Sequence, residues 1–260
     1  MRALLFLLFS FALFSCSDDL VSRSEPTGDK LAEVYFDKEK FYVYAYDSRG
    51  LLKAERSKWV YRSYSYDPQS RVVSEELYED PGMYSSSSAI AEASMNRTEW
   101  VSPENTVKSA TFQYHFDEGE RLISSSDRVP DHGSEFIYGS DGRIAERRMY
   151  SSGKLAGVRE YHYDSNGNMI RDTHYSISAN GTRQAGSVTE YEFDRGNNPY
   201  FHLSPVRIPG EYTNPNNITV KKYQAAGYPL SETRYTYTYN PAGYPVSRDQ
   251  GDFVTYYKYN

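Results

Sequence analysis

The chain has a single cysteine, Cys16, in 260 residues, so no intramolecular disulfide can form. Stability must therefore come from packing and from backbone hydrogen bonds. Long apolar runs are also scarce. The longest, from Ala3 to Phe14, is shorter than the roughly 20 residues that a membrane-spanning helix needs. No later stretch is apolar enough to cross a membrane.

Basic blocks are absent as well. The formal net charge is −6, and Lys and Arg are scattered along the chain. Proteins that bind nucleic acid or an anionic membrane surface present clustered basic residues. The sequence therefore argues against both kinds of partner.

The signatures of catalysis are missing too. There is no Gly-x-Ser-x-Gly motif and no phosphate-binding loop. The five histidines show neither the i, i+4 spacing nor the Cys/His clustering of a zinc site. We therefore expect no enzyme activity, no cofactor and no metal. Glycoside hydrolysis uses two neighbouring carboxylates, which only the folded chain could bring together. The spacing of Asp and Glu along the sequence identifies no such pair.

The N-terminus has the form of a signal peptide. Arg2 precedes the apolar run, and the run ends in "LFSC" at Cys16. A small residue before a lone cysteine resembles the lipobox of bacterial lipoproteins. The resemblance implies a signal peptide over residues 1–16 and acylation of Cys16, which would hold the chain on a membrane through its lipid.

The segment after the cysteine, residues 17–32, is polar and contains a proline and a glycine, as is typical of a flexible tether. Its first residues, Ser17, Asp18 and Asp19, resemble the acidic export signal of Bacteroidota surface lipoproteins. That resemblance implies a bacterial outer-membrane protein, lipid-anchored and exposed on the outer face.

Beyond residue 33 the chain is a tandem repeat. The units are "YAYDSRGLL" (44–52), "YSYDPQSRVV" (64–73), "YHFDEGERLI" (114–123), "FIYGSDGRI" (136–144), "YHYDSNGNMI" (161–170), "YEFDRGNNPY" (191–200) and "YTYNPAGYPV" (237–246). In a strand, Tyr161 and Tyr163 share one face while His162 points to the other. The alternation predicts an antiparallel sheet with one aromatic face and one wet face.

Each unit then carries the chemistry of a tight turn. The side chain of Asp164 accepts backbone N–H bonds, and Gly167 can adopt a positive φ, which suits a type I turn closed by a bulge. Asn240 replaces the aspartate in the last unit, which turn chemistry permits and acid catalysis does not. We assign turn roles to Asp47, Gly50, Asp67, Asp117, Gly119, Asp164, Gly167, Asp194, Gly196, Asn240 and Gly243.

These units resemble the YD repeats of RHS-type proteins, whose motif is Tyr-x-Tyr-Asp followed by glycine. The stretch from Gly196 also resembles part of Bacteroidota YD-repeat-like lipoproteins of unknown function. The resemblance implies an all-β fold, an antiparallel β-meander of tandem hairpins in a twisted or curled sheet. Because an exposed aromatic face would be sticky, we expect the sheet to curl over it or the loops to cover it.

Two stretches interrupt the repeat. Residues 79–110 are rich in serine and alanine and predict a loop insertion with a short helix near 89–95. Residues 195–218 contain four prolines and predict an ordered connection packed against the sheet. Long loops in a compact domain are often functional. The aromatic residues outside the repeat rhythm are therefore the binding candidates: Trp100, Tyr200, Tyr212, Tyr228 and Tyr244.

The sequence predicts one β domain over residues 33–260 that acts as a non-enzymatic binding or structural module. Tyrosine rings stack on sugars and their hydroxyls bind them, so a surface glycan is one expected partner and another envelope protein is the other. Two alternatives stay open. One is an envelope enzyme, such as a glycan-degrading hydrolase with carboxylates in a loop-formed cleft, and the other is a scaffold within a larger lipoprotein assembly.

Overall fold

Antiparallel strands account for nearly all regular structure in the computed structural model, which describes residues 30–80, 82, 99–127, 131–203 and 205–260. The first nine strands are β1 (Leu31–Phe36), β2 (Glu39–Tyr46), β3 (Leu52–Ser57), β4 (Val60–Tyr66), β5 (Val72–Glu79), β6 (Lys108–Phe116), β7 (Leu122–Ser126), β8 (Gly133–Tyr138) and β9 (Ile144–Ser151). The others are β10 (Lys154–Tyr163), β11 (Met169–Ile177), β12 (Arg183–Asn197), β13 (Asn216–Ala225), β14 (Ser231–Arg234), β15 (Thr236–Tyr239), β16 (Pro245–Asp249) and β17 (Val254–Tyr259). The predicted all-β meander is confirmed.

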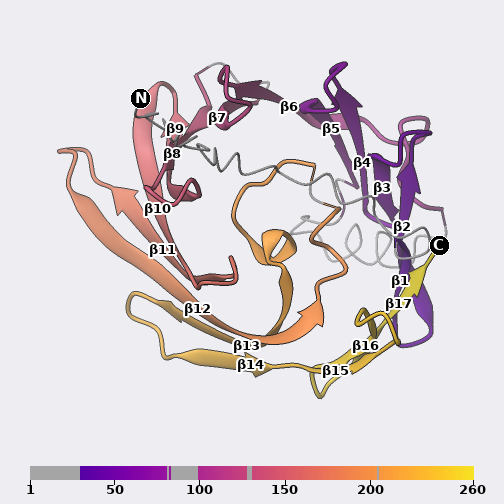
Figure 1. Cartoon of the computed structure of the whole chain (residues 1–260). Coiled ribbons are helices and arrows are strands. Elements are labelled where there is room, and N and C mark those ends of the chain that lie inside the picture. The colour runs from indigo at the N-terminus through magenta and orange to yellow at the C-terminus, as the bar shows by residue number, and fades with distance from the viewer. Residues whose placement is uncertain (1–29, 81, 83–98, 128–130, 204) are drawn as a thin grey trace, which may run out of the picture.

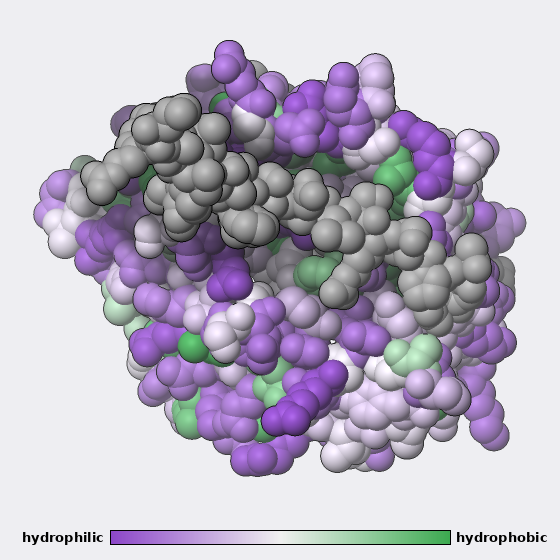
Figure 2. All heavy atoms as spheres, viewed as in Figure 1, coloured by the Kyte–Doolittle hydropathy of each residue, from purple (hydrophilic) through white to green (hydrophobic). Residues whose placement is uncertain are grey.

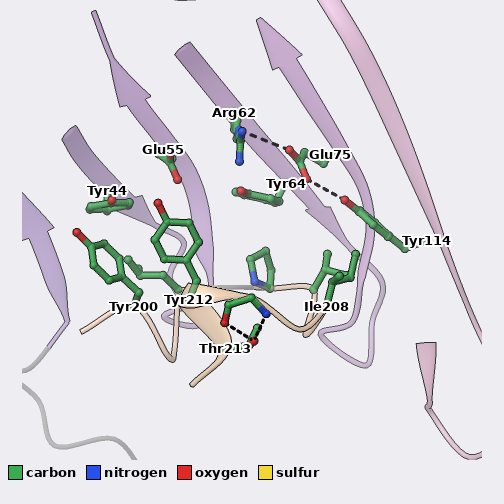
Figure 3. A pocket seen from close by; sticks show the side chains of 14 residues that line it. Tyr44, Glu55, Arg62, Tyr64, Glu75, Tyr114, Tyr200, Ile208, Tyr212 and Thr213 are labelled. Atoms are coloured by element: carbon green, nitrogen blue, oxygen red, sulfur yellow. Dashed lines mark hydrogen bonds and ion pairs between the residues drawn. The ribbon is translucent and has the colours of Figure 1, made fainter. Parts of the chain in front are cut away.

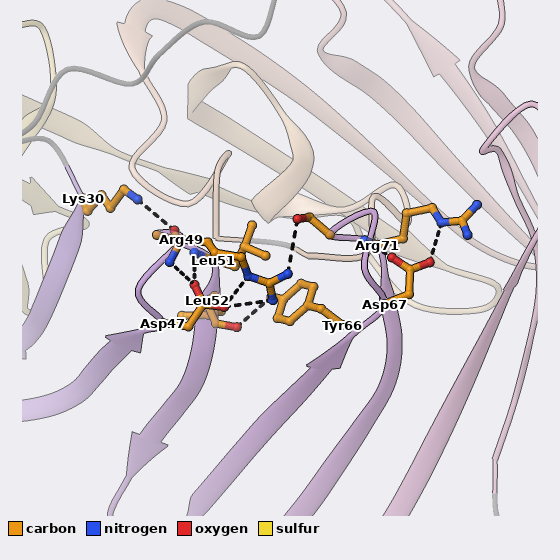
Figure 4. A network of polar contacts seen from close by, with 10 residues as sticks. Lys30, Asp47, Arg49, Leu51, Leu52, Tyr66, Asp67 and Arg71 are labelled. Carbon is orange, nitrogen blue, oxygen red and sulfur yellow. Dashed lines mark hydrogen bonds and ion pairs between the residues drawn. The ribbon is translucent and has the colours of Figure 1, made fainter.

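The turns follow from the residues that open them. Oδ1 of Asp47 accepts the backbone N–H groups of Arg49 and Leu51 at 2.9 and 3.0 Å. The N–H of Gly50 donates to the carbonyl of Asp47, and Gly50 has a φ of 82°. This is the type I turn with a bulge. Figure 4 shows this turn beside the following one, where the carboxylate of Asp67 forms an ion pair with Arg71.

Two units depart from the expected glycine positions. In the third unit the residue with positive φ is Glu120, at 63°, and not Gly119. In the sixth unit Asp194 and Gly196 open no hairpin, because β12 continues to Asn197. Oδ1 of Asp194 instead accepts the N–H of Gly196 at 2.9 Å and that of Asn217 at 3.2 Å. This aspartate therefore fastens β12 to the start of β13.

The strands form one closed ring (Figure 1). Each strand pairs with its neighbours in the chain, except that β14 and β15 do not pair with each other, and β1 pairs antiparallel with both β2 and β17. β14 and β15 are two halves of one strand interrupted at Tyr235, of which the first pairs with β13 and the second with β16. Counting them as one makes the number of strands even, as a closed antiparallel ring requires. The sheet thus curls over its aromatic face and has a barrel-like shape.

The connection between β12 and β13 runs through the inside of this ring, as the orange segment in Figure 1 shows. We call residues 198–203 and 205–215 the plug. It includes the short helix η2 (Glu211–Thr213). Leu203 and Val206 are buried, and each belongs to one of the two apolar clusters of the core. Inner side chains of the sheet form the rest of both clusters. The interior of the ring therefore contains the plug, which packs against the sheet as the sequence predicts.

The N-terminal boundary of the β domain lies slightly earlier in the chain than the sequence predicts. β1 begins at Leu31, inside the segment 17–32 that the composition assigns to a tether. The signal peptide expected over residues 1–16, with the predicted acylation site Cys16, and the helix expected near 89–95 lie outside the described residues. Hydrophilic side chains dominate the face of the ring seen in Figure 2. Among the described residues, no helical segment has the length and apolarity to span a bilayer.

Candidate functional site

A cavity of about 170 Å³ lies between the plug and the inner face of the strands β2 to β6. Figure 3 shows its lining side chains pointing toward one another from the two sides. The sheet contributes Tyr44, Glu55, Arg62, Tyr64, Glu75 and Tyr114, and the plug contributes Tyr200, Leu203, Pro205, Val206, Ile208, Gly210, Tyr212 and Thr213. This cavity joins charged, phenolic and apolar groups within the ring.

The strand register places the charged groups next to one another. Glu55 on β3 lies directly opposite Tyr44 on β2 and Arg62 on β4. Tyr64, two residues beyond Arg62 and so on the same face, lies opposite Glu75 on β5. Arg62 therefore stands between the two glutamates, as Figure 3 shows.

Two contacts hold Glu75 in place. The hydroxyl of Tyr114 donates to Oε2 of Glu75 at 2.8 Å, and Nε of Arg62 lies 3.7 Å from its Oε1. Nε of Arg62 is buried and has no hydrogen-bond partner within the described part of the chain. The side chain of Arg62 as a whole keeps 39% of its surface exposed, so solvent reaches the cavity.

The electrostatics of the cavity divide its groups into distinct roles. Burial raises the pKa of Glu55 above its ordinary value, and the Arg62 guanidinium offsets only part of that effect. Burial also raises the pKa of Tyr64 and of Tyr114 well above 10, so both stay neutral hydroxyls at pH 7. The cavity thus offers hydroxyl donors, a guanidinium and carboxyl groups to a polar ligand.

The plug side of the cavity is held by asparagines. Asn214, which is 1% exposed, accepts the N–H of Met169 at 2.7 Å and donates to the carbonyl of Gly210 at 2.9 Å. Asn198 donates to the carbonyl of Asn214 at 2.8 Å. These bonds satisfy the backbone of an irregular segment inside the ring. They fix the short helix that presents Tyr212.

Two of the five predicted binding residues reach this cavity. The rings of Tyr200 and Tyr212 lie 4.8 Å apart on the plug, and Tyr212 is 54% exposed.

The other three candidates lie elsewhere. The carbonyl of Trp100 accepts a bond from Arg56, whose neighbour Glu55 points inward, so Trp100 lies against the outside of the ring. Tyr228 is 71% exposed in the turn after β13, and Tyr244 packs against Tyr259.

The turn aspartates do not contribute to the site. The side chains of four of them accept hydrogen bonds from backbone N–H groups of their own turns: Asp47, Asp67, Asp117 and Asp164. The acids that converge are Glu55 and Glu75, which the sequence reading did not nominate. A signal for the site was present nonetheless: Arg62 precedes Tyr64 and Tyr66 at alternate positions and so had to share the tyrosine face. Within the described residues, no group of three acids, histidines or cysteines could hold a metal.

Comparisons with known proteins give fold likenesses only. No family model and no curated protein matches the chain. Among solved structures it is similar to a porin-like protein from Bacteroides uniformis (TM-score 0.41, 10% identity, covering 88% of this chain and 98% of that one). It is also similar to a porin-like protein from Bacteroides vulgatus (TM-score 0.42, 10% identity, covering 89% and 99%).

A third likeness is to a chain of the Tc holotoxin pore of Photorhabdus luminescens (TM-score 0.32, 12% identity, covering 84% of this chain and 13% of that one). This chain thus spans about an eighth of the toxin chain. Likenesses this low in identity and TM-score support no statement about the family or activity of the chain.

Proposed function

We propose that the chain is a lipid-anchored lipoprotein of a bacterial outer membrane, exposed on the cell surface, and that its β domain is a non-enzymatic module that binds glycan. The lipobox resemblance at Cys16 supports the anchor. The binding site is the cavity between the plug and the strands β2 to β6. The observation that carries the proposal is the exposed ring of Tyr212 beside an inward-facing Glu55–Arg62–Glu75 cluster.

A saccharide matches the groups of this cavity. Aromatic rings cover the apolar face of a sugar, while hydroxyls bind to carboxylates, guanidinium groups and phenols. Tyr44 from the sheet and Tyr212 from the plug provide rings at one end of the cavity (Figure 3). Glu55 provides an acceptor above these rings, and Arg62 provides a donor beside it. The apolar Ile208 and Val206 line another part of the cavity.

A glycan array probed with the purified full chain in nonionic detergent tests the proposal. We expect binding to a subset of polysaccharides, weakened at least tenfold by Tyr212→Ala. The matched control is Tyr256→Ala, which removes a tyrosine that is 45% exposed next to the inward-facing Tyr257. An empty array, or equal loss in both variants, would contradict a glycan site in the cavity. A pull-down from intact cells then tests the envelope-protein alternative.

A hydrolase is the second candidate, because two glutamates meet in the same cavity. Burial raises the pKa of Glu55, as in a general acid, and Glu75 is held by Tyr114 and Arg62. An acid and a carboxylate in different environments are the pair that glycosidases use. If the wild type releases reducing sugar from a bound glycan and Glu55→Gln does not, the hydrolase replaces the non-enzymatic proposal.

A further inference from the structure

A second cavity, of about 160 Å³, lies on the other side of the plug, against the strands β13 and β15 to β17. These strands lie along the lower part of the ring in Figure 1. Tyr200 and Tyr212 line both cavities, so the two are neighbours. The cavity is far larger than the roughly 10–15 Å³ that one water molecule needs. It has room for a small organic molecule.

The charges of this cavity do not cancel. Its lining includes two cations, Arg248 and Lys221, and one acid, Glu211. Glu211 already forms an ion pair with Lys221. Within the described residues, Arg248 forms no ion pair with any carboxylate. The cavity therefore has one positive charge that no carboxylate of the described residues pairs with.

The hydrogen bonding of Arg248 is equally incomplete. Its Nη2 donates one long bond, 3.4 Å, to Oγ1 of Thr255. Its Nε is buried and has no partner among the described residues. The guanidinium carbon lies 5.0 Å from the ring centroid of Tyr235, so the ring supports the cation on one side. An arginine has five N–H donors in a planar fork, and most of them remain to be satisfied.

The surrounding tyrosines do not supply the missing negative charge. Burial raises the pKa of Tyr257, of Tyr237 and of Tyr200 above its ordinary value. Their hydroxyls are therefore neutral at pH 7. The hydroxyl of Tyr237 is already engaged with the carbonyl of Ile218 at 2.8 Å. Nε of Arg248 is cut off from solvent although its side chain as a whole is only partly buried. A buried donor without a partner costs free energy that a bound acceptor would recover.

We propose that this second cavity binds a small molecule through an oxyanion group (carboxylate, sulfate or phosphate) seated on the guanidinium of Arg248. The planar fork of arginine matches two oxygens of such a group. The aromatic walls formed by Phe36, Tyr42 and Tyr257 cover the rest of the ligand. This site does not rest on the proposed glycan site, because Arg248 lines only the second cavity.

The test is an anion titration of the full chain in nonionic detergent. The thermal midpoint is followed by the near-ultraviolet signal of the tyrosines as sodium sulfate, sodium phosphate or sodium glucuronate is added. Ionic strength is held constant with sodium chloride, and glucose is the neutral control. We expect a saturable rise with at least one oxyanion over chloride and glucose. The oxyanion that acts at the lowest concentration identifies the group.

The variants locate the effect. Arg248→Gln should raise the half-saturating concentration at least tenfold, and Arg248→Lys should lie between it and the wild type. The matched control is Arg234→Gln, which removes the same charge from a side chain that is 70% exposed, and it should respond as the wild type does. If Arg248→Gln fails to fold, Arg248→Lys alone decides. No saturable rise with any oxyanion, or an unchanged rise in the Arg248 variants, overturns the proposal.

Discussion

The hydroxyl of Tyr66 donates a 2.7 Å hydrogen bond to the carbonyl oxygen of Leu52. Tyr66 is the second tyrosine of one hairpin unit, and Leu52 is the buried first residue of the return strand in the unit before it. The same bond joins Tyr46 to Leu31, Tyr138 to Leu122, Tyr163 to Ile144 and Tyr259 to Pro245. In these five places the second tyrosine of the motif therefore ties a hairpin to the strand that precedes it.

A cation lies over the tyrosine ring in four of these ties. The guanidinium of Arg49, in the turn of one unit, lies 5.7 Å from the ring centroid of Tyr66 in the next. Arg121 lies over Tyr138 and Arg143 over Tyr163 in the same way. Such contacts contribute about 0.5–1 kcal/mol each at exposed sites. The repeat thus stabilises the ring by a series of identical local links.

Removing one of these hydroxyls should destabilise the domain. We expect Tyr66→Phe to lower the free energy of unfolding by about 0.5–1.5 kcal/mol, because a hydrogen bond is lost while the ring stays. Urea denaturation measures the change. Tyr256→Phe, whose hydroxyl faces solvent, is the control and should have no effect. Equal stability of Tyr66→Phe and the wild type would show that the tie contributes nothing.

Adding a hydroxyl where the repeat lacks one should do the opposite. Phe116 is the second aromatic residue of the third unit, and by the rule of the repeat its partner is the carbonyl of Val72. We expect Phe116→Tyr to raise the free energy of unfolding by about 0.5–1.5 kcal/mol. Phe112→Tyr, four residues earlier on the same strand and face, has no such carbonyl and should give no gain. A loss of stability in Phe116→Tyr would count against the rule.

The buried acid of the first cavity makes stability depend on pH. Burial raises the folded-state pKa of Glu55 above its unfolded value, so the folded state binds more protons between the two pKa values. Stability from this group therefore falls as pH rises through that window. We expect Glu55→Gln to be more stable than the wild type at pH 7 and to differ little at pH 4. Urea denaturation at several pH values measures the free energy of unfolding of both proteins. A difference between them that stays the same from pH 4 to pH 7 would refute the assignment.

The anchor can be tested separately from the ring. If Cys16 is acylated, Cys16→Ala should move the protein from the membrane fraction to the soluble fraction and abolish labelling by a clickable fatty acid. The lipid is the only attachment in our account, so the shift should be nearly complete. A variant that stays with the membrane would require another attachment.

The repeat predicted the hairpins from sequence because their chemistry is local. The alternation of Tyr161 and Tyr163, the turn opener Asp164 and the bulge at Gly167 all act within ten residues. Closure of the ring was not predictable in this way, because it depends on Glu33 meeting Lys258 from opposite ends of the chain. Twist accumulated over all the intervening strands decides that contact.

The site was harder to predict than the fold for the same reason. Tyr200 and Tyr212 were predicted because they fall outside the repeat rhythm. Glu55 and Glu75 were not, because neither belongs to a motif and only strand register brings each to Arg62. Gly119 was assigned to the bulge because glycine favours positive φ, but the third unit has its bulge one residue later. The residue with positive φ is the third after the turn aspartate, as at Gly50 and Gly167. In the third unit that residue is Glu120, so the length of the turn decides the position and not the residue type.

The central claim is that the ligand binds inside the ring, and hydrogen–deuterium exchange with a glycan found on the array tests it most directly. We predict slower exchange in the plug segment 208–213 and in β4 around Arg62, with unchanged exchange at the outer turn 226–230. Protection confined to that turn, or to the outer segment around Trp100, would contradict the account.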